Sequence, residues 1–102
     1  MNVVTQRPLL NFAAEHADAG GALERWYRAA RKATWTNLAD VRATLPHADP
    51  VTVASGRTVV VFNIGGNKYR LVTAIHYDRQ RLFVLRVMTH KEYERGSWKD
   101  SL

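Results

Sequence analysis

Two segments of alternating apolar character each carry an arginine within the pattern, Arg70 in residues 69–77 and Arg86 in residues 81–88. A guanidinium among valine, alanine and leucine side chains loses hydration unless an anion or a carboxylate compensates it. Phosphate suits this role, because the planar guanidinium donates two parallel hydrogen bonds to it. The alternative is an arginine whose stem packs on a strand while its head reaches water. The pattern leaves both interpretations open for Arg70 and favours the second for Arg86.

A second group of reactive residues follows the second of these segments. Thr89 and Glu92 have the spacing of a capping box, which predicts a short helix beginning there. The start of that helix would bring His90, Lys91 and Tyr93 close to free backbone N–H groups that suit phosphate. Histidine transfers protons near neutral pH, and lysine balances the charge of a phosphorane. The alternative is an ordinary capped surface helix, which the spacing alone favours.

Other kinds of site are disfavoured. The chain has no cysteine, which excludes disulfides, thiolate metal ligands and a cysteine nucleophile. Its four histidines lack the spacing of metal ligands, and we expect neither a metal nor a cofactor. Gly65-Gly66-Asn67 joins two predicted strands with no helix after it, so it is not a phosphate-binding P-loop. No serine–histidine–aspartate arrangement is visible.

Helical periodicity dominates the first half of the chain. Thr5 can cap a first helix with Pro8 in its first turn, and Gly20-Gly21 would end that helix. Two further helices are expected at residues 22–33 and 36–45. The tryptophans are expected in the core or at an interface.

From residue 51 the period changes to two, and strands are expected at residues 51–54, 58–64, 69–77 and 81–88. Their short connections require antiparallel neighbours. Strict alternation would place Leu82, Val84, Arg86 and Met88 on one face of the last strand. We therefore predict one domain, residues 1–102, with an α+β fold: two to three N-terminal helices on a mainly antiparallel sheet of about four strands, then a short C-terminal helix.

The charge is the most informative part of the composition. The 102 residues carry 15 Lys and Arg against 9 Asp and Glu, a net charge of +6. Most of this excess lies after residue 51, which favours a polyanionic partner, nucleic acid first, although solubility alone could explain it. No apolar run approaches the roughly 18 residues of a membrane span, and no secretory signal is visible. We expect a cytoplasmic protein with no membrane contact.

Two motifs resemble a known family. Residues 62–70, FNIGGNKYR, and 87–93, VMTHKEY, closely resemble the HigB-type toxins of bacterial type II toxin–antitoxin systems, within the RelE superfamily. The order of elements agrees, so the resemblance covers nearly the whole chain. It implies a RelE-like fold and an mRNA interferase, an endoribonuclease that cuts mRNA on the translating ribosome. It also implies a cognate helix-turn-helix antitoxin, through which alone the toxin would reach operator DNA.

The resemblance also implies site residues. A strand arginine in a Tyr-Arg context corresponds to Arg70, a basic residue after the last strand to His90-Lys91, and a downstream tyrosine to Tyr93. Lys68 is a further expected substrate contact. We also expect four arginines of the second half to contact RNA: Arg57, Arg79, Arg81 and Arg86.

A cluster of these residue types could cut RNA without a metal. The ribose 2′-hydroxyl must lose a proton, the phosphorane charge must be balanced and the leaving 5′-oxygen must gain a proton. Our hypothesis assigns the charge to Arg70 and Lys91 and the protons to His90 and Tyr93. Two alternatives remain: a non-catalytic RNA- or ribosome-binding module with steep salt dependence, and an interaction protein whose basic groove accepts an acidic partner segment.

Overall fold

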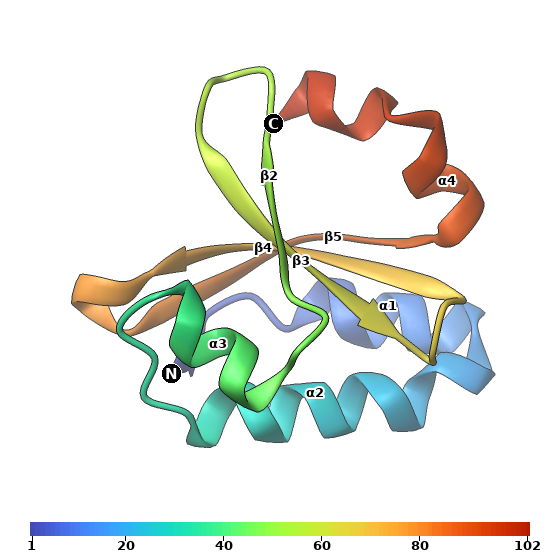
Figure 1. Cartoon of the computed structure of the whole chain (residues 1–102). Coiled ribbons are helices and arrows are strands. Elements are labelled where there is room, and N and C mark those ends of the chain that lie inside the picture. The colour runs from blue at the N-terminus through green and yellow to red at the C-terminus, as the bar shows by residue number, and fades with distance from the viewer.

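The computed structural model describes residues 1–102 and shows a central sheet with helices on both faces (Figure 1). In this view α1, α2 and α3 lie below the sheet, whereas α4 and the C-terminal turn lie above it. The predicted α+β class is therefore confirmed. The elements are β1 (Asn2–Val3), α1 (Arg7–Glu15), η1 (Ala17–Ala19), α2 (Gly20–Lys32), α3 (Leu38–Thr44), β2 (Asp49–Thr52), β3 (Thr58–Ile64), β4 (Tyr69–His76), η2 (Tyr77–Arg79), β5 (Arg81–Thr89), α4 (His90–Arg95) and η3 (Ser97–Ser101).

The sheet has the order β1-β5-β4-β3-β2, with four antiparallel strands and one parallel strand at the edge. The sequence did not predict β1, because two residues are too few for an alternating pattern. β1 runs parallel to β5, with Asn2 opposite Arg81 and Val3 opposite Leu82. At the other edge β2 begins two residues earlier than expected and contains Pro50, which an edge strand tolerates because one of its sides has no partner.

The two faces of the sheet bury different cores. The face below carries seventeen buried residues, including Trp26, Trp35 and Phe62, and the rings of both tryptophans lie near that of Phe62. The face above carries six: Val53, Val59, Val61, Val72, Met88 and Trp98. All three tryptophans are thus buried, as predicted. β4 lies between the two cores, so every residue from Tyr69 to Ala74 is buried.

A bulge in the β4–β5 pair overturns the predicted alternation on the last strand. Val72 lies opposite Arg86, but Thr73 lies opposite Val84, so Leu85 is the extra residue. An extra residue reverses the phase of the side chains that follow it. Leu82 and Val84 consequently pack below the sheet while Met88 packs above it, and the four residues do not share a face.

Two predictions about helix boundaries are wrong. Thr5 does not cap α1; its hydroxyl accepts the backbone N–H of Val84 at 3.1 Å, and Gln6 precedes the helix without a side-chain cap. Gly20 and Gly21 do not end a helix but begin α2, because Gly20 has helical backbone angles of φ −55° and ψ −49°. The chain leaves the first helix at His16 instead, and Pro8 occupies its first turn as expected.

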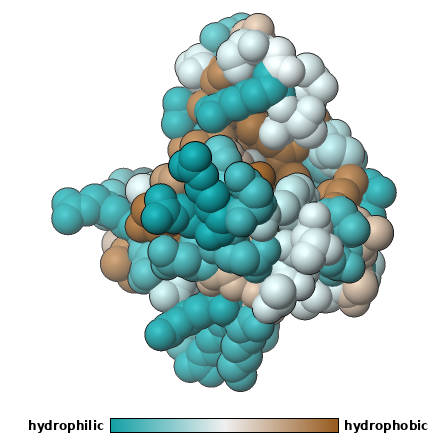
Figure 2. Space-filling model, turned by 90° about the vertical axis from the view of Figure 1, so that its left-hand side faces the viewer, coloured by the Kyte–Doolittle hydropathy of each residue, from teal (hydrophilic) through white to brown (hydrophobic).

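The face seen in Figure 2 is largely hydrophilic. Figure 2, which views the molecule from the left-hand side of Figure 1, shows broad teal areas with small brown patches, some of them where the upper part meets the body below. None of the helices combines the length and apolar character needed to cross a membrane.

Candidate active site

Arg70 is the only charged residue that the fold buries, with 8% of its surface exposed. Its guanidinium donates to Asn67 Oδ1 at 2.5 Å and to the carbonyls of Tyr69 at 3.1 Å and Asn67 at 3.4 Å. All three acceptors are neutral, and none of the four ion pairs in the molecule includes Arg70. The fold therefore buries a positive charge that forms no ion pair within the protein.

The β3–β4 turn holds this guanidinium in place. Gly65 and Gly66 have φ of +62° and +70°, a conformation that residues with a Cβ rarely adopt. This tight turn leaves Asn67 three residues before Arg70, where its amide oxygen meets the guanidinium. Asn63 lies directly opposite Arg70 on β3. The motif that suggested the family thus positions the arginine.

Tyr93 comes from α4 and lies against Arg70. The Arg70 Cζ atom is 5.5 Å from the centre of the Tyr93 ring, within the range of a cation–π contact. Trp98 also supports Tyr93. The two rings stack with their centres 5.2 Å apart, and the Trp98 Nε1 donates to the Tyr93 carbonyl at 3.1 Å. Burial and the nearby Asp49 carboxylate raise the pKa of Tyr93 above its usual 10.0, against the opposite influence of Arg70. Tyr93 is therefore protonated at neutral pH and can donate a hydrogen bond.

Arg70 and Tyr93 share a cleft of about 420 Å³ at the β2 side of the sheet. The sequence prediction missed its other polar residues, which come from α3, the loop after it, β2 and β3: Arg42, His47, Asp49 and Asn63. The Nε of Arg42 donates to the Ala48 carbonyl at 3.0 Å, which leaves its two terminal nitrogens free. Asn63 could have been found from the hairpin register, whereas nothing in the local pattern marks residues 42–49, because their place beside Arg70 depends on strand order.

His90 and Lys91 stand apart from this cleft, since neither lines it. The Nε2 of His90 lies 2.8 Å from Glu94 Oε1, and its Nδ1 is buried without a partner. Lys91 is exposed and makes no hydrogen bond or ion pair within the protein. The structure therefore brings together Arg70 and Tyr93 of the four predicted catalytic residues, and places His90 and Lys91 at the start of α4.

The start of α4 has the predicted capping box. Thr89 Oγ1 accepts the Glu92 backbone N–H at 3.2 Å, and Glu92 Oε1 accepts the Thr89 backbone N–H at 3.2 Å. The His90 N–H donates to the Lys68 carbonyl at 2.9 Å. These bonds occupy the N–H groups of Thr89, His90 and Glu92, which reduces the backbone donors that the start of α4 can offer to phosphate.

Lys68 lies in the β3–β4 turn, two residues before Arg70, and its Nζ is 3.4 Å from Asp18 Oδ2. The other oxygen of Asp18 accepts the Tyr69 hydroxyl at 2.6 Å. The Tyr69 hydrogen bond, and then Lys68, lower the pKa of Asp18 below 3.8, and the same bond raises the pKa of Tyr69. Asp18 thus ties η1 to the two residues that precede Arg70.

The remaining basic residues do not gather around Arg70. Arg57 lies in the β2–β3 turn, and Arg79 and Arg81 lie at the far end of the β4–β5 hairpin, where His76 pairs with Arg81. Arg86 is exposed on β5, and its guanidinium donates to the Leu85 carbonyl at 2.8 Å and to Ser101 Oγ at 3.4 Å. If these residues contact RNA, they do so away from the cleft.

The cleft offers two guanidinium groups, an imidazole, a phenol, an amide and a single carboxylate. No three His, Asp or Glu side chains lie close enough to hold a metal ion. The donor set suits a phosphate group, because arginine matches its geometry and charge. Imidazole and phenol groups beside a bound phosphate can move protons.

Comparisons with known proteins point to one family. Residues 19–96 match the model of HigB_toxin, described as the RelE-like toxic component of a toxin–antitoxin system. The chain is 28% identical over 94 residues to the mRNA interferase toxin HigB of Escherichia coli K12, covering 92% of this chain and 88% of that protein. The mRNA interferase HigB of Shigella flexneri gives the same values, and that of Escherichia coli O6:H1 is 23% identical over 95 residues, covering 93% and 90% of the two chains.

Proposed function

Because the chain belongs to the HigB toxin family, the RelE-like toxic components of toxin–antitoxin systems, we propose that it cuts mRNA in the cleft that holds Arg70 and Tyr93. The observation that carries this proposal is the burial of Arg70 with neutral partners only. A buried cation that forms no ion pair is costly to the folded state, and a bound anion compensates it. The scissile phosphate is that anion.

Charge stabilisation in this site belongs to the arginines. Arg70 faces the phosphate from β4, and the free terminal nitrogens of Arg42 approach it from α3. As the ribose 2′-oxygen attacks phosphorus, the negative charge on the phosphorane oxygens grows. Donors fixed in advance stabilise that charge more than the charge of the starting phosphodiester. Asn67 provides this fixing by holding the Arg70 guanidinium.

Proton transfer requires one acceptor and one donor. Tyr93 is protonated at neutral pH and lies next to Arg70, so we assign it the donor role toward the leaving 5′-oxygen. His47 lines the same cleft and is the acceptor for the 2′-hydroxyl proton. The sequence hypothesis gave a proton-transfer role to His90, but its Nε2 is engaged with Glu94 outside the cleft. We therefore place His47 in that role and His90 among the residues that hold the start of α4.

Lys91 and Lys68 are proposed to bind the RNA backbone beside the cleft. Both are exposed lysines next to the residues that surround Arg70, and Lys91 is unpaired. Such contacts add affinity without base specificity and weaken as salt rises.

The decisive experiment is primer extension on a reporter mRNA after brief induction of wild type, Arg70→Ala and Arg86→Ala. Losing a fixed donor to a transition-state oxyanion typically costs about 100- to 1,000-fold in rate, so Arg70→Ala should lose cleavage by that factor. Arg86→Ala, an exposed arginine on the neighbouring strand, should keep most of it. Circular dichroism must show all three proteins folded. Full cleavage by Arg70→Ala would make Arg70 a packing residue, and intact mRNA with soluble wild type would leave a binding module.

The chemistry of the ends tests the mechanism separately. Attack by the 2′-hydroxyl leaves a 2′,3′-cyclic phosphate or 3′-phosphate and a 5′-hydroxyl, in the presence of a chelator as in its absence. Magnesium-dependent 5′-phosphate ends would overturn this mechanism while leaving the nuclease activity in place. Cleavage of the same mRNA with and without ribosomes then tests our further proposal that cutting occurs on the translating ribosome.

A further inference from the structure

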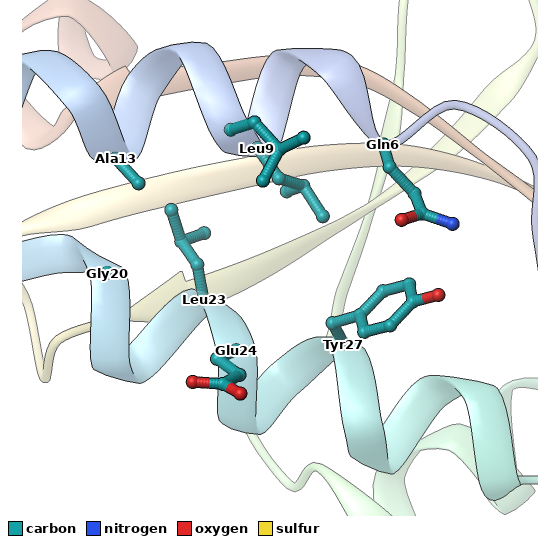
Figure 3. A pocket seen from close by; sticks show the side chains of 8 residues that line it. Gln6, Leu9, Ala13, Gly20, Leu23, Glu24 and Tyr27 are labelled. Atoms are coloured by element: carbon teal, nitrogen blue, oxygen red, sulfur yellow. The ribbon is translucent and has the colours of Figure 1, made fainter.

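A second hollow, of about 320 Å³, lies on the other side of the sheet between α1 and α2. Figure 3 shows Leu9 and Ala13 of α1 facing Leu23 of α2, with Gln6 and Tyr27 at one end and Glu24 on the rim. Leu9 and Leu23 are buried and form the floor. We call this hollow the α1–α2 groove.

The groove has an exposed apolar rim. Leu10 is 69% exposed and is the most exposed large hydrophobic residue of the chain. It lies on α1 beside the buried Leu9 and lines the groove, but most of its side chain is exposed to solvent. Single exposed leucines are common, but one on the rim of an apolar groove adds to a continuous apolar strip.

Basic residues of α2 border the groove. A neighbouring hollow shares Glu24 and Tyr27 with the groove and is otherwise lined by Arg28, Arg31 and Lys32. Arg28 is paired with Glu24 at 2.7 Å, whereas Arg31 and Lys32 are exposed and take part in no ion pair. The apolar side chains of the groove and the two unpaired cations, Arg31 and Lys32, therefore lie side by side on one surface.

We propose that the α1–α2 groove binds an amphipathic, acidic helix of the cognate antitoxin. An amphipathic helix places apolar side chains at positions i, i+3, i+4 and i+7 into such a groove. Acidic residues on its flank would meet Arg31 and Lys32, and this complementarity adds specificity and association rate. The nine residues of α1 span about 13 Å, which matches roughly two to three turns of a docked helix. The inference rests on the proposed function only in taking an antitoxin as the partner.

The chemistry of the groove favours a protein over RNA. RNA-binding surfaces combine cations with aromatic rings on which bases stack. The α1–α2 groove offers aliphatic side chains and one tyrosine, and a carboxylate, Glu24, lies on its rim. It also lies across the sheet from Arg70 and Tyr93, so a substitution here changes no residue of the cleft.

The test measures the affinity of purified toxin for its cognate antitoxin by titration calorimetry at two salt concentrations. The variants are Leu10→Asp, the pair Arg31→Glu and Lys32→Glu, and Lys99→Glu as a control with the same kind of charge change on η3. All these side chains are exposed, which favours unchanged folding. RNA cleavage without antitoxin is measured in parallel.

We expect Leu10→Asp to weaken binding at least about tenfold, because an aspartate would be desolvated in an apolar contact. The double charge reversal should weaken it about as much and reduce the salt dependence, and Lys99→Glu should not change it. Cleavage should be the same in all variants. Unchanged affinity in both groove variants would overturn the proposal, and so would lost cleavage with normal antitoxin binding, which would make the groove an RNA surface. If the wild type cuts no RNA but the groove variants weaken antitoxin binding as expected, the proposed function fails and the proposal about the groove is still supported.

Discussion

The two faces of the sheet differ in what covers them. Below the sheet, α1, α2 and α3 enclose seventeen buried residues, whereas above it one short helix and a 3-10 turn cover six. Arg70 and Tyr93 belong to the thinly covered face: Arg70 lies opposite Met88 of the upper core, and Tyr93 packs against that core. We propose that stability and chemistry are divided between opposite sides of the same strands: the thickly covered face supplies most of the stability, and the thinly covered face holds the charged side chain at the edge of the cleft.

The largest effects that test this division are expected from replacing one tryptophan on each face. Trp26→Ala removes a buried ring beside Phe62 and should lower the free energy of unfolding by about 3–5 kcal/mol. Trp98→Ala should lower it less and should abolish most cleavage, because Trp98 supports Tyr93 through stacking and a hydrogen bond. Urea unfolding and RNA cleavage measure the two effects. Equal losses of stability with cleavage intact in Trp98→Ala would contradict the division.

Two adjacent valines on β3 allow a matched comparison of the two faces. Val60 packs below the sheet and Val61 above it, where it also lines the cleft. Each Val→Ala change should cost about 1.5–3 kcal/mol of stability through two lost methyl groups and a cavity. Only Val61→Ala should also reduce cleavage, because its loss reshapes the cleft wall. A decrease in cleavage by Val60→Ala of the same size, at a temperature where both variants are folded, would count against the separation of roles.

How well the sequence predicted an element depends on whether its signal is local or comes from pairing with distant residues. β3, β4 and β5 and the capped α4 were predictable within a residue or two, because alternation, turn glycines and the capping box are local signals. β1 and the bulge at Leu85 were not, since both depend on pairing partners far along the chain. Arg70 and Tyr93 came from the motifs, whereas Arg42, His47 and Asp49 join them only through the position of β2 at the sheet edge.

A smaller effect is expected from the residue that fixes the guanidinium. Asn67→Ala removes the 2.5 Å hydrogen bond to Arg70 and leaves the backbone carbonyls as acceptors. A hydrogen bond to a charged group is worth about 1.5–3 kcal/mol, so cleavage should fall about 10- to 150-fold, while Asn67→Asp should hold the arginine as an ion pair. If Asn67→Ala cleaves at the wild-type rate, the turn does not position Arg70.

The smallest effect concerns acid stability. The folded-state pKa of Asp18 is depressed below 3.8, so the stability that its bonds to Tyr69 and Lys68 contribute is present above pH 3.8 and is lost as the pH falls through the folded value. Asp18→Asn should therefore lower the melting temperature by a few degrees at pH 7 and by less at pH 3. Calorimetry at both pH values measures this, with Asp78→Asn, an exposed aspartate of η2, as control. An equal decrease at both would show that the charge of Asp18 does not matter.

The pairing of β1 with β5 has a consequence for how the chain acquires its structure. Thr5 and Val84, which bond beside this pair, are 79 residues apart in the sequence. Contacts between such distant segments close a long loop and form late in folding. During synthesis from the N-terminus, residues 2–5 have no partner until residues 81–84 have left the ribosome, and Tyr93 follows later still. The nascent chain thus cannot assemble the complete cleft until β5 and Tyr93 have both left the ribosome.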